Sequence, residues 1–280
     1  MINSLAIKQK INFFLDKLFG YQFIKTKLRG NYIDSKEFNK NDLNLNIGSG
    51  GISYPFFINL DMPSKHYEPS HEGHKFIAYN LIKDELPFKN DSVSNIYCSH
   101  VVEHCTDEHV QKLFYECIRV LKKKGILRLT CPDSKFLYEV CSFENEFWRK
   151  REHVIKKLRQ EKNSVDRYDY IIERIASNKS RLNTPEYTEI HSKIKSMKYE
   201  ETMDFLTRDN KQDINKPGNH INFFDYEKLE KMLKNSCLDL NITNYKIVNS
   251  KCKGSVSQLM AEDCFDKREA ISVFVDFVKL

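Results

Sequence analysis

The segment LNLNIGSGG, residues 43–51, decides the fold prediction, because a strand-like apolar run leads directly into a turn with three glycines. LNLNI (43–47) has the pattern of a short strand. Glycines accept turn conformations that a side chain forbids, so the backbone of GSGG (48–51) can approach a ligand closely. We therefore take this turn as the first candidate binding element.

The sequence after this turn alternates between strand and helix patterns. FFINLD (56–61) and SNIYCS (94–99) are strand-like, residues 107–125 place apolar side chains on one helical face, and ILRLTCPD (126–133) returns to a strand. Such alternation predicts a mostly parallel sheet with helices on its faces. Ligands of these sheets bind beyond the carboxyl ends of the strands.

An acidic residue follows the second predicted strand. Asp61 stands where a carboxylate can hold both hydroxyls of a ribose. The dinucleotide fingerprint G-x-G-x-x-G fails, because Ser53 occupies the third glycine position, and this disfavours a nicotinamide dehydrogenase. The alternative is a tight structural turn with a surface aspartate.

The domain prediction has two parts. Residues 1–42 are expected to form an N-terminal helical extension, and residues 43–280 form one domain with a helical insertion at about 143–216. The insertion is expected because this stretch is highly charged, rich in Tyr and without a strand pattern. Strands are expected again near 239–248 and 270–279.

Composition narrows the function classes. No run approaches the roughly 18 apolar residues of a membrane span, and the N-terminal stretch has no A-x-A-like cleavage site, so we expect a cytoplasmic protein. The eight cysteines include no C-x-x-C pair, which argues against a zinc knuckle or a redox dithiol. The net charge of +6 favours anionic substrates, but basic and acidic residues are interspersed, so nucleic-acid binding is not indicated.

The motifs, taken in order, carry a family resemblance. LNLNIGSGG, FFINLD, YNLIKDELPFKNDSVSNIYCSHVVEHC (79–105) and FYECIRVLKKKGILRLTCPD (114–133) resemble the class I S-adenosylmethionine-dependent methyltransferases. HINFFDY and FDKREAISVFVDFVKL near the C-terminus resemble the closing elements of the same family. The most similar group is the small bacterial, type 11-like one associated with surface-polysaccharide and nucleotide-sugar pathways. The resemblance covers residues 43–142 and 217–280.

The resemblance implies a fold and a cofactor site. The fold would be Rossmann-like, a mostly parallel seven-stranded sheet with an antiparallel last strand. The cofactor would be S-adenosylmethionine, with S-adenosylhomocysteine as product. The residues assigned to it are Gly48 and Gly50 at the methionine part, Asp61 at the ribose, Met62 beside the adenine, Asn80 and Leu81 at the adenine edge, and Asn46, Ser49 and Ser99 around them.

Two departures from the family pattern concern this site. Many members have Asp where this chain has Asn80, although an amide oxygen still accepts a hydrogen bond from an amine. Only nine residues connect Ile47 to Phe57, whereas a parallel crossover usually needs about a dozen or more. This leaves little room for a full first helix.

SHVVEHC, residues 99–105, contains His-x-x-Glu-His, the spacing of one class of zinc peptidase. A catalytic zinc needs three protein ligands and a water. His100 directly follows a strand pattern, so the pair His100 and His104 is not expected inside a helix, and our predicted site contains no metal. A second histidine group, in KHYEPSHEGH (65–74), lacks helical or Cys spacing and is expected to be a solvated loop.

Methyl transfer gives these residues another role. Alignment of donor and acceptor supplies most of the acceleration, and an acceptor hydroxyl must lose a proton, for which His is a suitable base. We predict His100, Glu103 and His104 as catalytic residues and His220 and Asp133 as substrate contacts. The alternatives are a buried or capping role for each histidine, a helix lead-in for His220 and a turn cap for Asp133.

The predicted reaction is O-methylation of a sugar, nucleotide sugar or phosphorylated metabolite in capsule or lipopolysaccharide synthesis. The expected partner is a small acceptor, anionic or sugar-like, and a homodimer is an open alternative. Another small metabolite or RNA is the second hypothesis, although RNA would need a continuous basic stripe. Two hypotheses belong to other classes of protein. One is a non-catalytic nucleotide-binding subunit, which the presence of Gly48, Gly50 and Asp61 disfavours. The other is a zinc hydrolase, which a chelator would inactivate.

Overall fold

The computed structural model covers the chain in seven described stretches. They are residues 42–50, 57–62, 75–142, 166–180, 184–213, 216–249 and 271–280. The predicted N-terminal extension, most of the first crossover and the histidine-containing loop at 65–74 lie outside the described residues. No helix within the described stretches has the length and apolar character needed to cross a bilayer.

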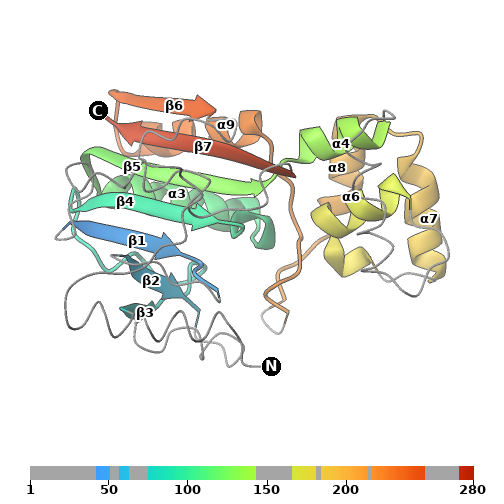
Figure 1. Ribbon diagram of the computed structural model, residues 1–280, viewed down its shortest axis with the longest axis horizontal. Coiled ribbons are helices and arrows are strands. Elements are labelled where there is room, and N and C mark those ends of the chain that lie inside the picture. Colours follow the sequence, from blue (N-terminus) through green and yellow to red (C-terminus); the bar gives the residue numbers. More distant parts are fainter. Residues whose placement is uncertain are drawn as a thin grey trace, which may run out of the picture.

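One seven-stranded sheet organises the molecule, in the order β3-β2-β1-β4-β5-β7-β6 (Figure 1). Strand β7 is antiparallel to both of its neighbours, and the other described pairings are parallel. The strands are β1 (Leu43–Ile47), β2 (Ile58–Asp61), β3 (Phe76–Ala78), β4 (Val93–Ser99), β5 (Leu121–Pro132), β6 (Tyr245–Asn249) and β7 (Ser272–Lys279). The predicted fold class is therefore confirmed, while β3 was not predicted.

The register aligns the carboxyl ends of the central strands. Ile47, the last residue of β1, lies beside Leu60 of β2 and Cys98 of β4. Ser99 of β4 lies beside Thr130 of β5. The residues that follow these positions therefore meet along one side of the sheet, which we call the carboxyl edge.

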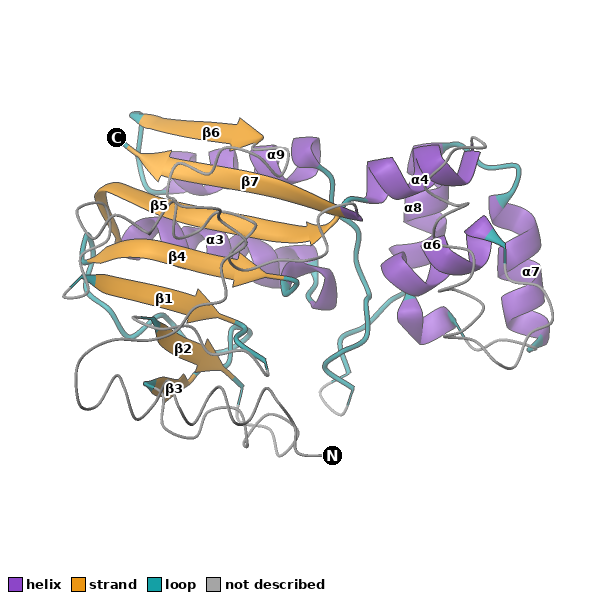
Figure 2. Ribbon diagram, viewed as in Figure 1, coloured by secondary structure: helices purple, strands orange, loops and turns teal. Residues whose placement is uncertain are grey.

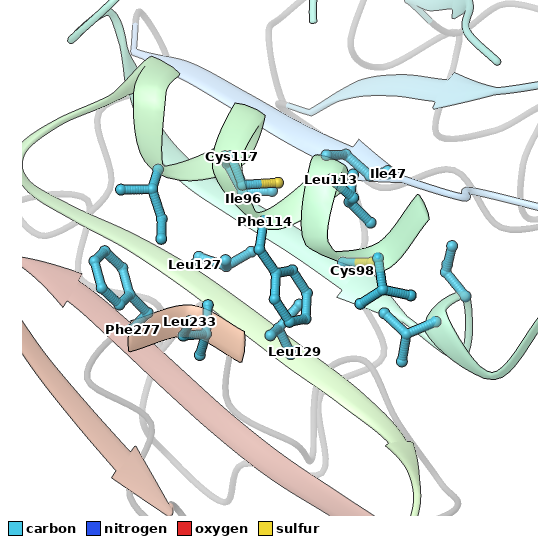
Figure 3. Packing of buried hydrophobic residues seen from close by; sticks show 14 of the residues in the cluster. Ile47, Ile96, Cys98, Leu113, Phe114, Cys117, Leu127, Leu129, Leu233 and Phe277 are labelled. Atoms are coloured by element: carbon cyan, nitrogen blue, oxygen red, sulfur yellow. The ribbon is translucent and has the colours of Figure 1, made fainter. Parts of the chain in front are cut away.

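Two helices, α3 (Asp107–Val120) and α9 (Tyr226–Asp239), cover one face of the sheet (Figure 2). Fully buried side chains such as Phe114, Leu127 and Leu233 interlock between them and the strands (Figure 3). Each buried side chain of this kind contributes about 1.5–3 kcal/mol to folding. This layer is the main hydrophobic core of the protein.

Helix α3 ends earlier than the sequence pattern predicts. We expected it to continue to Gly125, but it ends at Val120, where Leu121 takes an extended conformation and begins β5. The buried Leu121 pairs with Val93 of β4, so sheet pairing ends the helix. The predicted strand at 239–248 begins only at Tyr245, because α9 continues to Asp239.

The opposite face of the sheet is polar yet buried. Asn46 donates from Nδ2 to Asn59 Oδ1 at 2.9 Å, and Asn95 donates in the same way to Asn44 Oδ1 at 2.7 Å. Farther along, Arg128 Nε of β5 lies 3.0 Å from Asp276 Oδ1 of β7, and both side chains are at most 1% exposed. Side chains alternate between the two faces of a strand, so these polar pairs occupy every second position.

A group of helices lies beyond the carboxyl edge (Figure 1). We call it the helical insertion, and its described members are α4 (Ser134–Ser142), α6 (Arg167–Ile175), α7 (Pro185–Ile194) and α8 (Tyr199–Thr207). It has its own apolar cluster, which includes Ile172, Tyr187 and Met203. Tyr199 ties it to the sheet domain by donating to Asp225 Oδ2 at 2.6 Å.

Candidate functional site

The glycine turn after β1 requires glycine. Gly48 and Gly50 have φ values of 65° and 50°, a region that other residues rarely adopt. The N–H groups of Gly48 and Ser49 both donate to the carbonyl of Leu60, at 2.8 and 3.3 Å. A Cβ atom on Gly48 would collide with the side chain of Val101. The turn is thus held tightly between β2 and the segment that follows β4.

Asp61 faces this turn. One of its carboxylate oxygens accepts a hydrogen bond from the N–H of Gly50 at 2.6 Å, and the other accepts from the N–H of Met62 at 2.7 Å. A carboxylate oxygen has more than one lone pair, so each can still accept a ligand hydroxyl. The structure therefore brings together three of the residues predicted for the cofactor, Gly50, Asp61 and Met62.

Ser49 adds an unusual polar atom to the turn. Its residue is 5% exposed, and its hydroxyl has no hydrogen-bond partner in the described part of the chain. A buried hydroxyl without a partner is costly, and a ligand that bonds to it removes that cost. The turn thus has the features of a cradle for a polar ligand.

The other predicted cofactor residues have contacts within the protein. Asn46 is buried and bonds to Asn59, and the side-chain oxygen of Asn80 accepts from the N–H of Ile82 at 3.0 Å, which fixes a local turn. Leu81 packs against the main core, and Ser99 is the last residue of β4. Asn46 and Asn80 therefore contribute to the structure of the site, whatever they bind.

His100 is the first residue after β4, and it is strongly constrained. Its φ of 55° is unusual for a residue other than glycine, and its N–H donates to Thr130 at 2.7 Å. Its Nδ1 lies 2.9 Å from Glu103 Oε1, and its Nε2 lies 3.1 Å from the hydroxyl of Ser272. Both ring nitrogens are engaged and the side chain is 7% exposed, so His100 is placed to hold Glu103.

The rest of His-x-x-Glu-His forms a single 3₁₀ turn, η1 (Val102–His104). His100 lies outside this turn, so the two histidines do not share a face at helical i, i+4 spacing. The zinc-peptidase geometry of His100 and His104 is therefore not present, in agreement with the strand-to-turn context in the sequence.

Glu103 is the buried centre of the site, at 1% exposure. Burial alone would raise the pKa of its carboxyl, but the ion pair and hydrogen bond with His100, together with His104 and His220, outweigh burial and lower the pKa to about 2. Its backbone carbonyl accepts from the N–H groups of Ile221 and Asn222, at 2.9 and 3.2 Å. These two bonds bring the distant segment with His220 to the carboxyl edge.

His104 and His220 lie against each other, with ring centroids 4.8 Å apart and an interplanar angle of 79°. His104 Nδ1 lies 3.0 Å from the carbonyl oxygen of Asn219, and His220 Nδ1 lies 2.6 Å from that of Arg174. A carbonyl oxygen only accepts, so each Nδ1 carries a hydrogen, and the uncharged form of each ring has its lone pair at Nε2. Burial lowers the pKa of His220 to about 4, against the opposing effect of Glu103, so this ring is neutral at pH 7.

Asp133 caps a helix. Its Oδ1 accepts from the N–H of Phe136 at 3.1 Å, in the first turn of α4. Burial raises the pKa of its carboxyl, although the hydrogen bond from Phe136 opposes this shift. The capping alternative for Asp133 thus matches its described contacts.

Three further residues shape the site without a motif that marks them. Asn219 fixes the ring of His104, Ser272 contacts His100, and Asn222 donates to the carbonyl of Cys105 at 2.9 Å. Asn222 lies in HINFFDY and Ser272 in FDKREAISVFVDFVKL, but neither motif singles out the residue. The contacts of Asn219 and Ser272 arise from tertiary packing, so no local pattern could have found them.

Comparison with known proteins adds a family match. Residues 59–129 match the model of a family described as a methyltransferase domain. No curated protein sequence matches the chain.

Solved structures similar to this chain include a SAM-dependent methyltransferase from Methanosarcina mazei, at 14% identity, covering 89% of this chain and 98% of that one, with a TM-score of 0.42. Another is a SAM-dependent methyltransferase from Archaeoglobus fulgidus, at 14% identity, covering 86% and 87%, with a TM-score of 0.41. A third, from Mesorhizobium loti, has 15% identity, coverage of 84% and 90%, and a TM-score of 0.40.

The assignment rests on the matched segment and on the sheet that contains it. Residues 59–129 include most of β2, all of β3, β4 and α3, and much of β5, so the match extends from the β3 side of the sheet to its centre and includes part of the carboxyl edge. The chain thus contains a segment that matches a methyltransferase domain.

Proposed function

We propose that the protein transfers a methyl group to an oxygen atom of a small acceptor that binds between the carboxyl edge and the helical insertion. S-adenosylmethionine, when bound, supplies an electrophilic methyl group on a positively charged sulfur. The observation that carries the proposal is the cluster of His104, His220 and the buried Glu103, in which one ligand atom of each residue lies within 4.8 Å of the others while both Nδ1 atoms face carbonyl oxygens. Val101, the residue directly before the turn that contains Glu103, lies against Gly48, so this group adjoins the glycine turn.

The glycine turn has the properties that the donor requires. In this proposal Gly48, Ser49 and Gly50 hold the methionine part of the donor, and the hydroxyl of Ser49 forms a hydrogen bond with it. Asp61 holds the ribose hydroxyls, with Met62 beside the adenine. Around them, Asn80, Leu81, Asn46 and Ser99 complete the wall of the site.

His104 is the member of the site that an acceptor would meet, because its side chain is 21% exposed whereas that of Glu103 is 1% exposed. In this proposal the lone pair at His104 Nε2 activates the acceptor hydroxyl. Glu103, whose low pKa keeps it charged, stabilises positive charge that develops beside it. His100 holds Glu103 in place, and Asn219 holds His104.

The acceptor proposed is a sugar, a nucleotide sugar or a phosphorylated metabolite of capsule or lipopolysaccharide synthesis, methylated in the cytoplasm. The family resemblance supports this choice, and the net charge of +6 favours an anionic acceptor. His220 would contact it from the segment that follows the helical insertion, and Asp133 would border the same space from the end of β5.

Replacing Asp61 by Asn should weaken S-adenosylhomocysteine binding about 10- to 100-fold, because a hydrogen bond to a charged group is worth about 1.5–3 kcal/mol. The substitution keeps the shape of the side chain and removes its charge. Isothermal titration calorimetry measures the change. Asp204→Asn is the matched control and should bind as the wild type does, because Asp204, on α8, forms an exposed ion pair with Arg208, directly after that helix. Equal affinities for the two variants would contradict the role of Asp61.

Replacing His104 by Gln tests the methyl-transfer site itself. S-adenosylhomocysteine should bind normally, while release of S-adenosylhomocysteine with a panel of sugars and nucleotide sugars should fall at least about 100-fold, as for loss of an acid–base group. His109→Gln is the matched control, because that ring pairs with Thr106 and Gln212 outside the site. Failure of the wild type to bind S-adenosylhomocysteine at tens of micromolar would refute the proposed function.

A further inference from the structure

We infer that Glu103, His104 and His220 form a binding site for one divalent transition-metal ion, with Zn²⁺ as the natural probe. These residues come from two segments more than a hundred positions apart in the sequence. The ligand set differs from the His-x-x-Glu-His pattern, because His100 is replaced by His220. We call the three residues the Glu–His–His cluster.

The distances are those of a nearly assembled site. One ligand atom from each residue lies within 4.8 Å of the others, and His104 Nε2 lies 4.0 Å from Glu103 Oε1. Zinc binds nitrogen and oxygen at about 2.0–2.2 Å, so a shared ion requires the ligand atoms to approach one another by about 1 Å. His104 is partly exposed and can make such a shift by a small rotation of its ring.

The ring orientations are the second part of the argument. Both histidines donate from Nδ1 to backbone carbonyls, of Asn219 and Arg174, which leaves Nε2 as the available ligand atom. Metal-binding histidines usually have this outer hydrogen bond, which fixes the tautomer and the direction of the lone pair. Two histidines without a ligand to bind would not both need an Nδ1 hydrogen bond that fixes the direction of the ring.

Glu103 supplies an independent observation. It is 99% buried, and its Oε2 atom has no hydrogen-bond partner in the described part of the chain. Its other oxygen faces His100 at 2.9 Å, so His100 would orient the carboxylate as an outer ligand partner. A buried carboxylate oxygen without a donor is expensive, and a bound cation removes this cost.

A second group with metal-binding residue types makes an instructive contrast. Asp166, Asp169 and His191 also lie close together, in the helical insertion. There, Asp166 caps α6, accepting from the N–H groups of Tyr168 and Asp169, and His191 Nε2 bonds to Asp166 Oδ1 at 2.8 Å. Tyr187 donates to Asp169. Helix capping and these bonds account for that group, so it carries no proposal.

The use of the ion rests on the proposed function. Three protein ligands leave an open coordination position, and a bound cation lowers the pKa of a hydroxyl that occupies it. The hydroxyl would release its proton to water, and an oxygen lone pair would form the bond to the methyl carbon. The carbon–sulfur bond would break, with its electron pair remaining on the sulfur of S-adenosylhomocysteine. The lone pair of His104 would then bind the ion, and the ion would activate the acceptor hydroxyl.

Titration of the full chain with Zn²⁺, after removal of metals with a chelator, tests the site. We expect the wild type to bind one ion per chain. His104→Gln and His220→Gln should each lower the zinc affinity at least about 100-fold, since loss of even an outer hydrogen-bond partner costs about 10- to 100-fold in affinity. His191→Gln, in the contrasting group, should bind zinc as the wild type does. Binding of Co²⁺ should produce visible absorption that both cluster variants lose, which reports the ligands without any activity assay.

Two outcomes overturn the inference: no zinc binding by the wild type, or zinc binding that both cluster variants retain. Unchanged thermal unfolding of His104→Gln, the more exposed of the two positions, shows that a loss of zinc binding is not a loss of folding. S-adenosylhomocysteine titrations of the same samples separate the two proposals. If the chain binds S-adenosylhomocysteine but not zinc, the metal site is refuted and the proposed function stands. If it binds zinc but not S-adenosylhomocysteine, the proposed function is refuted and the metal site stands.

Discussion

Gly48→Ala should lower the affinity for S-adenosylhomocysteine by about 100-fold or more. Two penalties act together: a non-glycine residue at positive φ costs about 1–2 kcal/mol, and overpacking costs about 1–3 kcal/mol. Gly48 has a φ of 65°, and its new Cβ would collide with Val101. The turn would have to move to accommodate the methyl group, and the N–H of Gly50 would move away from Asp61.

Titration calorimetry against S-adenosylhomocysteine measures this change, with circular dichroism to show that the sheet still forms. Gly218→Ala is the matched control, because its Cβ would meet no atom within 4 Å and its φ is not positive. Cofactor affinity should be unchanged in that variant. Wild-type affinity in Gly48→Ala would show that the turn does not contact the cofactor.

Arg128→Met should destabilise the fold by about 3–5 kcal/mol, the cost of breaking a buried ion pair by removing one of its members. Arg128 and Asp276 join β5 and β7 at 3.0 Å, both at most 1% exposed, and the guanidinium also lies over the ring of Phe274 at 5.3 Å. Methionine is close in length to the arginine stem, so most of the packing is kept. The loss of stability therefore reports the broken ion pair with Asp276.

Urea unfolding monitored by circular dichroism measures this loss. Lys135→Met is the control, since its ion pair with Glu227 also spans 3.0 Å but both side chains are about half exposed. Exposed pairs contribute about 0–1 kcal/mol, so the midpoint should change little. The double variant Arg128→Met/Asp276→Leu should recover much of the stability, because an apolar pair can replace a buried ion pair. A loss below about 1 kcal/mol in Arg128→Met would contradict the argument.

The fold was predictable from the sequence where local patterns are strong. The glycine turn, the acid after β2 and the strand patterns of β4 and β5 each depend on a few neighbouring residues, and together they predicted the sheet. Strand β3, only Phe76–Ala78, is too short for its pattern to stand out. The end of α3 was also missed, because pairing of Leu121 with Val93 decides it and helical spacing does not.

The candidate site was only partly predictable. Glu103 and His104 lie in one short motif, so their proximity follows from the sequence. His220 reaches them because Ile221 and Asn222 donate to the carbonyl of Glu103, and no pattern around residue 220 indicates this. The sequence also could not show that His100 is engaged through both ring nitrogens, since Ser272 lies on another strand. The structure brings Glu103, His104 and His220 together, and their partners depend on tertiary structure.

The attachment of the helical insertion has a structural consequence. The chain leaves the sheet at Asp133 and returns at Phe224, and these two residues form a parallel bridge, with Ser134 donating to the carbonyl of Phe224 at 2.9 Å. The chain therefore leaves and re-enters the sheet domain at one point. The entropy cost of joining the two parts of that domain thus depends little on the length of the segment between them. Exchange of this segment as a unit would therefore replace Asn219 and His220 of the proposed site and leave the glycine turn in place.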